Sequence, residues 1–373
     1  MKKLGLIVNP IAGMGGKVGL KGSDGPEILR KAVELGAKPE APLRAILALE
    51  RLLPARDRFE LLTYPFDMGE EEARACGFEP EVFGTIQKGE TTAEDTRRAA
   101  LEMERLKVDL LLFAGGDGTA RDIYSAVRDR IPALGIPTGV KMHSAVYATS
   151  PRTAGELARL FIEERTSEIR LVDGEVMDID EASFRENRVS ARLYGYLKVP
   201  FKRTMIQSPK AGGCAGGREA LDALATEVIR EMEEDCLYII GTGTTTRAVM
   251  EKLGLPGTLL GIDAVYNRRL IGSDLNESRI LRLMEERRTK IVVGIIGRQG
   301  YIFGRGNQQI SARIIQKVGR ENIIVIATME KLLTLEGRPL LVDTGDEELD
   351  RKLSGYIRVI TGIGERAMLK VKA

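Results

Sequence analysis

The sequence predicts an α/β protein: a Rossmann-like parallel α/β domain at the N-terminus, followed by a second, β-rich α+β domain. Two observations predict the first part. Short apolar runs alternate with segments of helical periodicity, and glycine-rich turns directly follow two of the apolar runs. A third predicts the second part, because short alternating segments without long helices begin near Glu168. We place the domains at residues 1–165 and 166–373, and leave open that the final strand returns to the first domain.

Composition excludes several classes of function. With 56 Lys and Arg against 54 Asp and Glu the net charge is only +2, and no dense basic run is present, so no nucleic-acid partner is expected. No apolar run approaches the roughly 20 residues of a membrane span, and the N-terminus lacks a signal-type apolar segment. We therefore expect a cytoplasmic protein with no membrane partner. We also expect it to form a homo-oligomer.

The cysteine and histidine content argues against metal sites and triad hydrolases. Cys76, Cys214 and Cys236 form no CxxC pair, which suits a reducing compartment and argues against structural zinc. His143 is the only histidine, so a two-histidine metal site is impossible and a Ser-His-Asp triad would have to use this one ring.

The stretch Leu110–Thr119 (LLLFAGGDGT) is the centre of the predicted first domain: a buried strand, a glycine turn and the start of a helix that continues to Val127. Glycines let backbone amides approach a polyanion, and a helix N-terminus adds a favourable dipole. We therefore predict phosphate binding at Gly115, Gly116, Gly118 and Thr119. Asp117 is predicted to orient a hydroxyl, accept its proton or hold Mg²⁺ through water. The alternative is a plain turn in which Asp117 is a cap residue.

The other elements of the first domain follow from periodicity and capping. Strands are predicted at residues 4–8, 59–64, 81–86 and 132–137. Helices are predicted at residues 69–76, 91–107 and 150–164. Two more helices are predicted inside residues 27–53, because Pro39 and Pro42 interrupt the helical pattern there. Thr91 and Glu94 suggest a capping box. The loop from Asn9 to Lys17 fits neither Walker A nor GxGxxG, so a phosphate or ribose loop and a flexible connection stay open.

The loop after residue 137 is expected at the same edge of the sheet, because the carboxyl ends of parallel strands meet there. It carries Thr138, Lys141, His143 and Ser144. Lys141 is a candidate for neutralising phosphate charge, and an exposed lysine beside a turn is the simpler interpretation. His143 and Ser144 are candidates for substrate binding, with a structural role as the simpler interpretation of the histidine.

In the second domain, residues 169–179 and 189–201 are predicted to form an antiparallel pair. Asp173, Glu175, Asp178 and Asp180 alternate with apolar residues and are expected on its wet face. The glycine-dense loop Ala211–Gly217 precedes a helix, and we leave open whether it is a lid, an anion nest or a plain connection. Further strands are predicted at 236–240, 291–296, 301–303 and 323–328, with two more in 356–371.

Two polar loops of the second domain are candidate ligand sites. Gly241–Thr246 (GTGTTT) lies between a strand and a helix predicted at 247–253. Its hydroxyl groups suit phosphate oxygens or ribose; they belong to Thr242, Thr244, Thr245 and Thr246. The alternative, a simple N-cap, explains only one of these threonines. Gly304–Ser311 contains Arg305, Asn307 and Gln308, which suit recognition of a base, a sugar or a carboxamide, with a polar turn as the alternative. The acidic residues from Asp343 to Asp350 are explained by a helix start.

With these motifs in place, the chain resembles the superfamily of NAD kinases and diacylglycerol-type kinases. The resemblance is carried by Asn9-Pro10, by Gly115–Thr119, and by Gly241–Ala248, which aligns without a gap on the NAD kinase stretch usually written GTPTGSTA. The chain is most similar to the ATP-NAD kinase-like group, through Pro137–Ser144, Gly304–Gln309 and Val342–Asp346.

The resemblance implies a two-domain kinase that uses ATP and Mg²⁺ in a cleft between the domains. Asp117 would activate or orient the acceptor hydroxyl, the residues around it would contact phosphates, and Thr244 and Thr246 would face ribose or phosphate. Two departures concern the acceptor. The Asn-Glu pair that holds adenine in typical NAD kinases precedes the threonine loop there, whereas Asn276-Glu277 follows it, and Pro137–Ser144 replaces the usual glycine motif.

We therefore expect a kinase that transfers the γ-phosphoryl group of ATP to the 2′-hydroxyl of NAD, or to a related small-molecule hydroxyl. Two alternatives stay open. One is a kinase of the same fold that acts on a lipid or polyol, and the other is a catalytically silent module that senses NAD or ATP.

Overall fold

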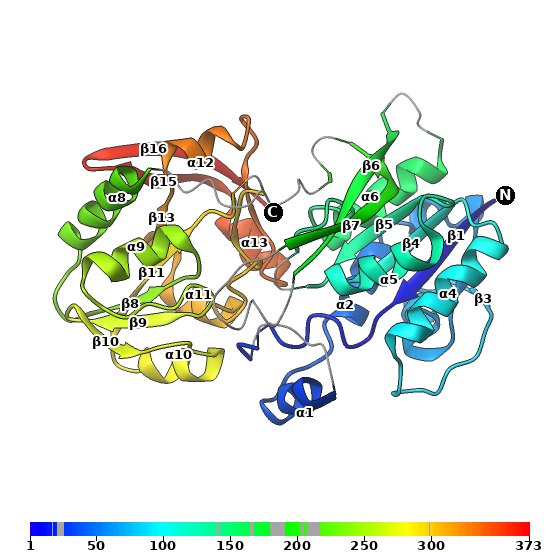
Figure 1. Cartoon of the computed structure of the whole chain (residues 1–373), viewed down its shortest axis with the longest axis horizontal. Coiled ribbons are helices and arrows are strands. Elements are labelled where there is room, and N and C mark those ends of the chain that lie inside the picture. The colour runs from blue at the N-terminus through cyan, green and yellow to red at the C-terminus, as the bar shows by residue number, and fades with distance from the viewer. Residues whose placement is uncertain are drawn as a thin grey trace. The chain divides into compact units, whose positions relative to one another are not determined.

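The computed structural model describes residues 1–16, 18–20, 26–139, 142–164, 168–179, 191–202, 205–206, 217–297 and 299–373 (Figure 1). The chain divides into two compact units. Unit 1 comprises Met1–Met14 and Gly22–Lys210, and unit 2 comprises Gly15–Lys21 and Ala211–Ala373. Within the described ranges, no helix has the length and apolar character that crossing a membrane requires.

Unit 1 contains a five-stranded parallel sheet in the order β3-β2-β1-β4-β5. Its strands are β1 (Lys2–Val8), β2 (Phe59–Thr63), β3 (Glu81–Val82), β4 (Leu110–Gly115) and β5 (Ala133–Pro137). Every residue of β4 and β5 is buried, which explains their continuous apolar sequences. The strand order reverses between β1 and β4, the place where ligands bind in open parallel sheets.

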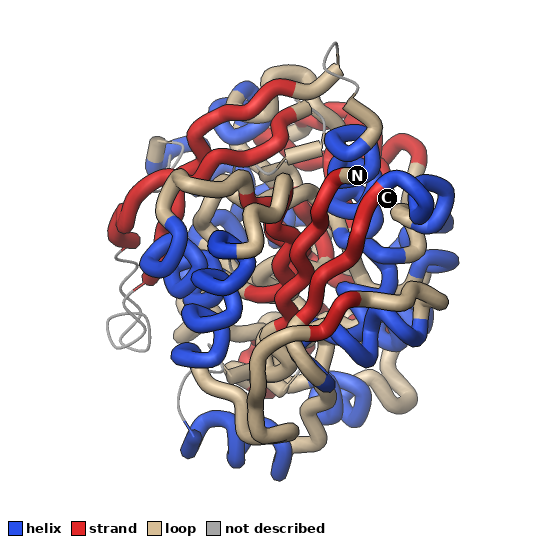
Figure 2. The backbone as a smooth tube through the Cα atoms, turned by 90° about the vertical axis from the view of Figure 1, so that its right-hand side faces the viewer, coloured by secondary structure: helices blue, strands red, loops and turns tan. Residues whose placement is uncertain are grey.

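The helices of unit 1 are α1 (Pro26–Glu34), α2 (Ala41–Leu49), α3 (Glu70–Ala75), α4 (Ala93–Arg105), α5 (Asp117–Val127) and α6 (Pro151–Ile162), with short 3₁₀ turns at Leu53–Arg58 and Phe66–Met68. Helix α4 packs on α5, and α2 packs on α6. Figure 2 shows the backbone with helices in blue and strands in red. The capping box of α4 is one residue later than expected, because Thr92 and Asp95 form it instead of Thr91 and Glu94.

The antiparallel pair predicted after residue 168 is the two-stranded sheet β6 (Arg170–Ile179) and β7 (Ala191–Phe201). It belongs to unit 1, so the units divide after Lys210 instead of at 165/166. Hydrogen bonds from the loop after β5 attach it: Ala145 N–H donates to the Glu175 carbonyl at 2.8 Å. Asp178 is not on a wet face as expected, because it is buried and pairs with Arg121 of α5.

Within the described residues, unit 2 has a mixed nine-stranded sheet in the order β10-β9-β8-β11-β13-β15-β16-β14-β12. The strands are β8 (Cys236–Ile240), β9 (Asp263–Tyr266), β10 (Arg269–Gly272), β11 (Arg288–Gly294), β12 (Tyr301–Phe303), β13 (Ile323–Ile326), β14 (Leu340–Val342), β15 (Gly355–Gly362) and β16 (Glu365–Lys372). Pairs β8–β11, β11–β13 and β13–β15 are parallel. The last strand, β16, pairs with β15 and β14 inside unit 2, so it does not return to the first sheet.

Both faces of the unit 2 sheet are covered. The helices are α8 (Arg218–Arg230), α9 (Thr244–Lys252), α10 (Glu277–Leu283), α11 (Ala312–Val318), α12 (Met329–Leu333) and α13 (Glu347–Leu353), with a 3₁₀ turn at Arg320–Asn322. Alternate residues of β8 enter different cores: Tyr238 joins a cluster with residues of α8 and α9, and Leu237 and Ile239 join one with residues of α10, α11 and α13. This two-sided burial is the physical reason for the apolar run in β8.

Glu72 in α3 supplies a test of the pH dependence of stability. Its side chain is 4% exposed, its Oε2 has no hydrogen-bond partner among the described residues, and burial raises the pKa of its carboxyl from 4.5 to about 7. Because this pKa is higher in the folded than in the unfolded state, folding takes up a proton between pH 4.5 and about 7. The free energy of unfolding therefore falls as the pH rises through this range. Between about pH 4.5 and 8 the parent should lose on the order of 2–3 kcal/mol of unfolding free energy through this group, and Glu72→Gln should not show that loss.

Urea unfolding at both pH values measures this effect. The exposed Glu79 is the matched control, and Glu79→Gln should leave the pH dependence as in the parent. An identical slope of unfolding free energy against pH in the parent and in Glu72→Gln would contradict the assignment.

Candidate functional site

The described candidate residues of unit 1 gather at the carboxyl ends of β1, β4 and β5. Asn9 follows β1 and its backbone N–H donates to the Ala114 carbonyl of β4 at 2.9 Å. Its side-chain Nδ2 donates to Thr119 Oγ1, also at 2.9 Å. Two candidate residues that lie 110 positions apart in the chain are therefore in direct contact at the point where the strand order reverses.

The glycines allow the close approaches that build this edge. Gly116 is the N-cap of α5 and makes no side-chain cap, so Asp117, Gly118 and Thr119 form the first turn of the helix. A Cβ on Gly115 would lie 2.4 Å from Thr119 Oγ1, and one on Gly139 would lie 3.2 Å from Gly116 Cα. The first-turn amides, which have no partner within a helix, together with the positive end of the helix dipole, suit an anion.

The Asp117 carboxylate is already engaged within the protein. It is 6% exposed, and it accepts backbone N–H donors from His143 at 2.6 Å and from Ser144 at 3.1 Å. The Ser144 hydroxyl donates in turn to the Met177 carbonyl of β6 at 2.8 Å. Asp117 therefore holds the loop after β5 against α5, a contact that sequence analysis did not foresee. Lys141, the other candidate of this loop, lies outside the described residues.

The threonine loop of unit 2 follows β8 at the carboxyl edge of its sheet. Helix α9 begins at Thr244, three residues earlier than expected. Thr242 Oγ1 donates to the Gly306 carbonyl at 2.9 Å, and Thr246 Oγ1 donates to the Gly243 carbonyl at 3.0 Å. Thr244 is exposed, and Gly243 gives the helix no side-chain cap. As at α5, the first-turn amides of α9 are left for another acceptor.

Sequence analysis missed Lys331 at this loop. Its Nζ donates to Thr245 Oγ1 at 2.9 Å. The lysine comes from α12, 86 positions along the chain, in a segment without a motif, so no local signal marked it. An ammonium group and a helix N-terminus are both positive, so together they suit an anion.

The candidate amide loop Gly304–Ser311 is largely buried and adjoins the threonine loop through the Thr242–Gly306 hydrogen bond. Arg305 is 3% and Asn307 is 5% exposed. The Arg305 guanidinium lies over the Tyr301 ring at 5.0 Å, with Nε 3.6 Å from Asp343 Oδ2. Asn307 Nδ2 donates to the Ile302 carbonyl and Gln308 Nε2 to the Gly304 carbonyl. These contacts hold the loop's shape, and a substrate role for the three side chains stays a prediction.

The acidic segment after β14 and the Asn276-Glu277 pair have structural roles. Asp346 caps α13 by accepting the Leu349 N–H, and Asn276 caps α10 by accepting the Arg279 N–H. Burial raises the pKa of Asp350 to about 6, although the Thr344 hydroxyl and N–H donate to this carboxyl.

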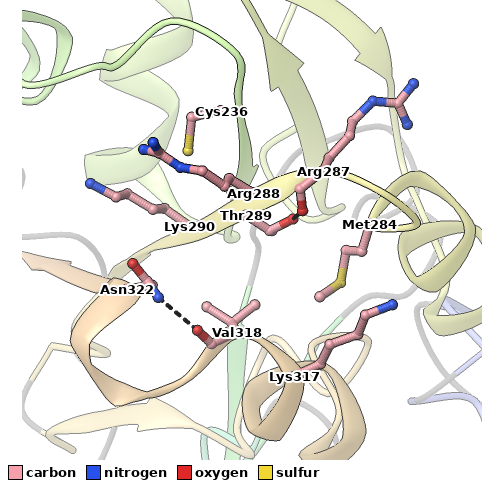
Figure 3. A pocket seen from close by; sticks show the side chains of 9 residues that line it. All are labelled: Cys236, Met284, Arg287, Arg288, Thr289, Lys290, Lys317, Val318 and Asn322. Atoms are coloured by element: carbon pink, nitrogen blue, oxygen red, sulfur yellow. Dashed lines mark hydrogen bonds between the residues drawn. The ribbon is translucent and has the colours of Figure 1, made fainter.

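A surface cavity of about 250 Å³ lies elsewhere in unit 2, at the amino-terminal ends of β8 and β11 (Figure 3). Several cationic side chains line it, and each described contact has a structural explanation. Arg288 and Lys290 pair with Glu233, while Arg287 donates to the Leu283 carbonyl at the end of α10 and lies over Tyr266. Cations at helix C-termini are favoured by the dipole. Figure 3 shows Arg287 pointing away from Arg288 and Lys290, so the charges do not converge on one ligand.

Two family models match the chain. The model of the ATP-NAD kinase N-terminal domain matches residues 4–166, and that of the ATP-NAD kinase C-terminal domain matches residues 233–371. Together they contain the GGDGT loop, the threonine loop and the amide loop. No curated protein matches the chain.

Among solved structures, a diacylglycerol kinase from Bacillus anthracis str. Sterne is 19% identical, with 48% of each chain covered and a TM-score of 0.24. Another Bacillus anthracis structure of this kind is 21% identical over 48% of this chain and 43% of its own, with a TM-score of 0.23. A UDP-N-acetylglucosamine 2-epimerase is 11% identical over 93% of this chain and 80% of its own, with a TM-score of 0.24. The chain thus spans about half the length of the diacylglycerol kinases. These low scores add nothing to the family models.

Proposed function

We propose that this chain, which belongs to the ATP-NAD kinase family, transfers the γ-phosphoryl group of ATP to the 2′-hydroxyl of NAD or to a related small-molecule hydroxyl. The observation that carries the proposal is the match of both family domains across chain segments that contain the two uncapped helix N-termini. Phosphoryl transfer depends on positioning and on neutralising charge, and less on covalent catalysis. The site chemistry of both units suits that requirement.

In unit 1, the first turn of α5 supports a phosphate-binding role for Gly116, Gly118 and Thr119. Asn9 holds the Thr119 hydroxyl, and Gly115 leaves the space that this hydroxyl occupies. Asp117 is the carboxylate of this turn, so we assign it to activation of the acceptor hydroxyl. Lys141 is proposed to add positive charge in the same loop as His143 and Ser144.

In unit 2, the first turn of α9 supports a second phosphate or ribose site at Thr242, Thr244, Thr245 and Thr246. Lys331 strengthens this proposal, because its ammonium group and the positive end of α9 meet at Thr245. A phosphate there would interact favourably with both positive groups. The neighbouring Arg305, Asn307 and Gln308 are proposed to shape the substrate side of this loop.

Mg²⁺ fits this proposal as a partner of the nucleotide. The described residues contain no group of three or more His, Cys, Asp or Glu that could hold a metal, and both Asp117 oxygens accept backbone donors. Mg²⁺ usually keeps several waters and binds substrate phosphates, so it would arrive with ATP and neutralise phosphate charge there.

The test is a panel of acceptors incubated with the full chain, ATP and Mg²⁺. The panel contains NAD, a polyol, diacylglycerol in mixed micelles and no acceptor, and both ADP release and NADP formation are measured. We expect NADP and ADP to appear in equal amounts with NAD.

Each other outcome replaces part of the proposal. ADP release only with the polyol or the lipid keeps the kinase and changes its substrate. Nucleotide binding without ADP release from any member of the panel would instead identify a silent NAD or ATP sensor.

A further inference from the structure

The β6–β7 pair packs against α5 and presents an exposed cation beside it (Figure 1). Arg192 of β7 is exposed and lies opposite Asp178 of β6, so the two side chains share one face of the pair. That face is turned toward α5, because Asp178 pairs with Arg121 of this helix at 2.5 Å. Arg121 comes four residues after Asp117, which places both on one side of the helix, about 6 Å apart along its axis. Arg192 is therefore on the side of α5 that carries the carboxylate assigned to the acceptor hydroxyl.

Hydrogen bonds through one loop connect this end of β6 to the first turn of α5. The Ser144 N–H donates to Asp117 Oδ1 at 3.1 Å, and the Met177 N–H donates to Ser144 Oγ at 2.9 Å. Met177 directly precedes Asp178, the cross-strand neighbour of Arg192. The contacts that hold Asp117 therefore also fix the part of the β6–β7 pair from which Arg192 projects.

A β-bulge places an aromatic ring under the guanidinium of Arg192. The register of the pair shifts by one residue between Val176 and Met177, which makes Tyr194 the extra residue of β7. Arg192 Cζ lies 5.3 Å from the centroid of the Tyr194 ring, and Arg121 Cζ lies 5.9 Å from it. Cation–π contacts of this kind hold an arginine in place while its N–H groups can still donate to another molecule. Bulges are frequent next to active sites, where they re-aim a side chain.

The charge of Arg192 is suited to an anionic ligand. Among the residues that the structure describes, no carboxylate lies within ion-pair distance of its guanidinium, whereas Arg121 is neutralised by Asp178. A guanidinium stays protonated at any working pH, and its fork of N–H donors matches two oxygens of a phosphate. An oriented and exposed guanidinium near the site of a hydroxyl therefore suits an acceptor that carries a phosphate group of its own.

We propose that Arg192 binds a phosphate group of the acceptor and that Tyr194 positions the guanidinium; this inference rests on the proposed function. The acceptor is then a phosphorylated compound with a free hydroxyl, such as a dinucleotide, and neither a neutral polyol nor diacylglycerol. Arg192 contacts a part of the acceptor that does not react, so it selects the acceptor without changing the rate of the chemical step. Activation of the hydroxyl stays with Asp117.

Kinetics with the acceptor found in the panel test this assignment. Arg192→Gln changes an exposed side chain, so folding should be unaffected. The KM for the acceptor should rise about 10–100-fold, with kcat and the KM for ATP within about twofold of the parent. Arg192→Lys should recover part of the loss, because lysine restores the charge without the fork. Lys198→Gln removes another cation of β7, one that pairs with Asp173, and is the matched control that should leave all three constants unchanged.

Salt dependence supplies a readout that a structural role would not change. Between about 50 and 500 mM KCl, the KM of the parent for the acceptor should rise more steeply than that of Arg192→Gln, because salt screens an exposed charge pair. Equal slopes in the two chains would mean that Arg192 makes no ionic contact with the acceptor.

Binding without turnover separates this inference from the proposed function. The full chain is titrated in a calorimeter with the acceptor found in the panel, or with NAD if none is phosphorylated, in the presence of Mg²⁺ and a non-hydrolysable ATP analogue. We expect the parent to bind at least about tenfold more tightly than Arg192→Gln. Equal affinities, no binding to either chain, or an acceptor without a phosphate group would overturn the role of Arg192. A parent that phosphorylates no acceptor would overturn the proposed kinase function, and the titration with NAD would still decide the role of Arg192.

Discussion

Asp117→Asn is expected to lower turnover about 1,000-fold while the affinity for ATP stays within about twofold of the parent. The substitution removes the negative charge of the carboxylate that we assign to activation of the acceptor hydroxyl. Nucleotide binding should survive, because the amides of α5 and the Asn9–Thr119 contact do not depend on the carboxylate charge. Steady-state kinetics and ATP titration calorimetry measure the two effects separately.

A structural contribution must be separated from this chemical one. Asp117 accepts two backbone N–H donors, and an asparagine can accept from one while turning its NH₂ group toward the other. We therefore expect a stability loss on the order of 1–2 kcal/mol in addition. Asp122→Asn is the control on the same helix, since Asp122 pairs with Arg97 of α4. A parent-like turnover in Asp117→Asn would remove Asp117 from the mechanism, and lost ATP binding would make its role structural.

Gly155→Ala is expected to destabilise unit 1 by about 3 kcal/mol or more. Gly155 is buried in α6 where that helix crosses α2. A Cβ there would lie 1.9 Å from the Ala48 carbonyl oxygen and 2.9 Å from Arg51 Cβ. The nearest obstruction is backbone, so the helices themselves would have to separate. Alanine otherwise favours a helix by about 1 kcal/mol over glycine, which makes a loss of stability a clear signature of the clash.

Urea unfolding of the variant measures this loss. Gly217→Ala is the control, because no atom of the described residues lies within 4 Å of a Cβ at Gly217 and its φ of −46° suits alanine. That control should change the unfolding free energy by less than about 1 kcal/mol. An unchanged or raised stability in Gly155→Ala would mean that α2 and α6 yield to the added methyl group without cost.

The central strands and loops could be predicted because their causes are local. The buried run of β4, the glycine turn after it and the helix from Asp117 depend on neighbouring residues alone. The same holds for β8 and its threonine loop, although the helix start at Thr244 was placed three residues late. The grouping of Asn9 with Thr119 also followed from sequence, since parallel strands bring their carboxyl ends to one edge.

Other features required contacts that no local pattern encodes. Asp178 alternates with apolar residues as an exposed acid would, and only the position of Arg121 on α5 makes it buried and paired. The pair β6–β7 has the sequence of any antiparallel hairpin, and its membership of unit 1 depends on hydrogen bonds from the loop after β5. Lys331 reaches Thr245 from a helix that carries no motif.

By itself, the sequence determined the types of the central strands and helices and the family to which the chain belongs, and phosphate binding at the glycine and threonine loops stays a prediction. Only the tertiary structure decided the neighbours of the reactive groups. In the sequence, His143 was most simply a satisfied structural residue. Among the residues that the structure describes, its ring has no hydrogen-bond partner, and its Nδ1 lies 3.5 Å from Oδ2 of Asp117, 26 positions away. Burial raises the cost of an unpaired group, and whether a partner is present depends on how separate strands and helices pack, not on local sequence.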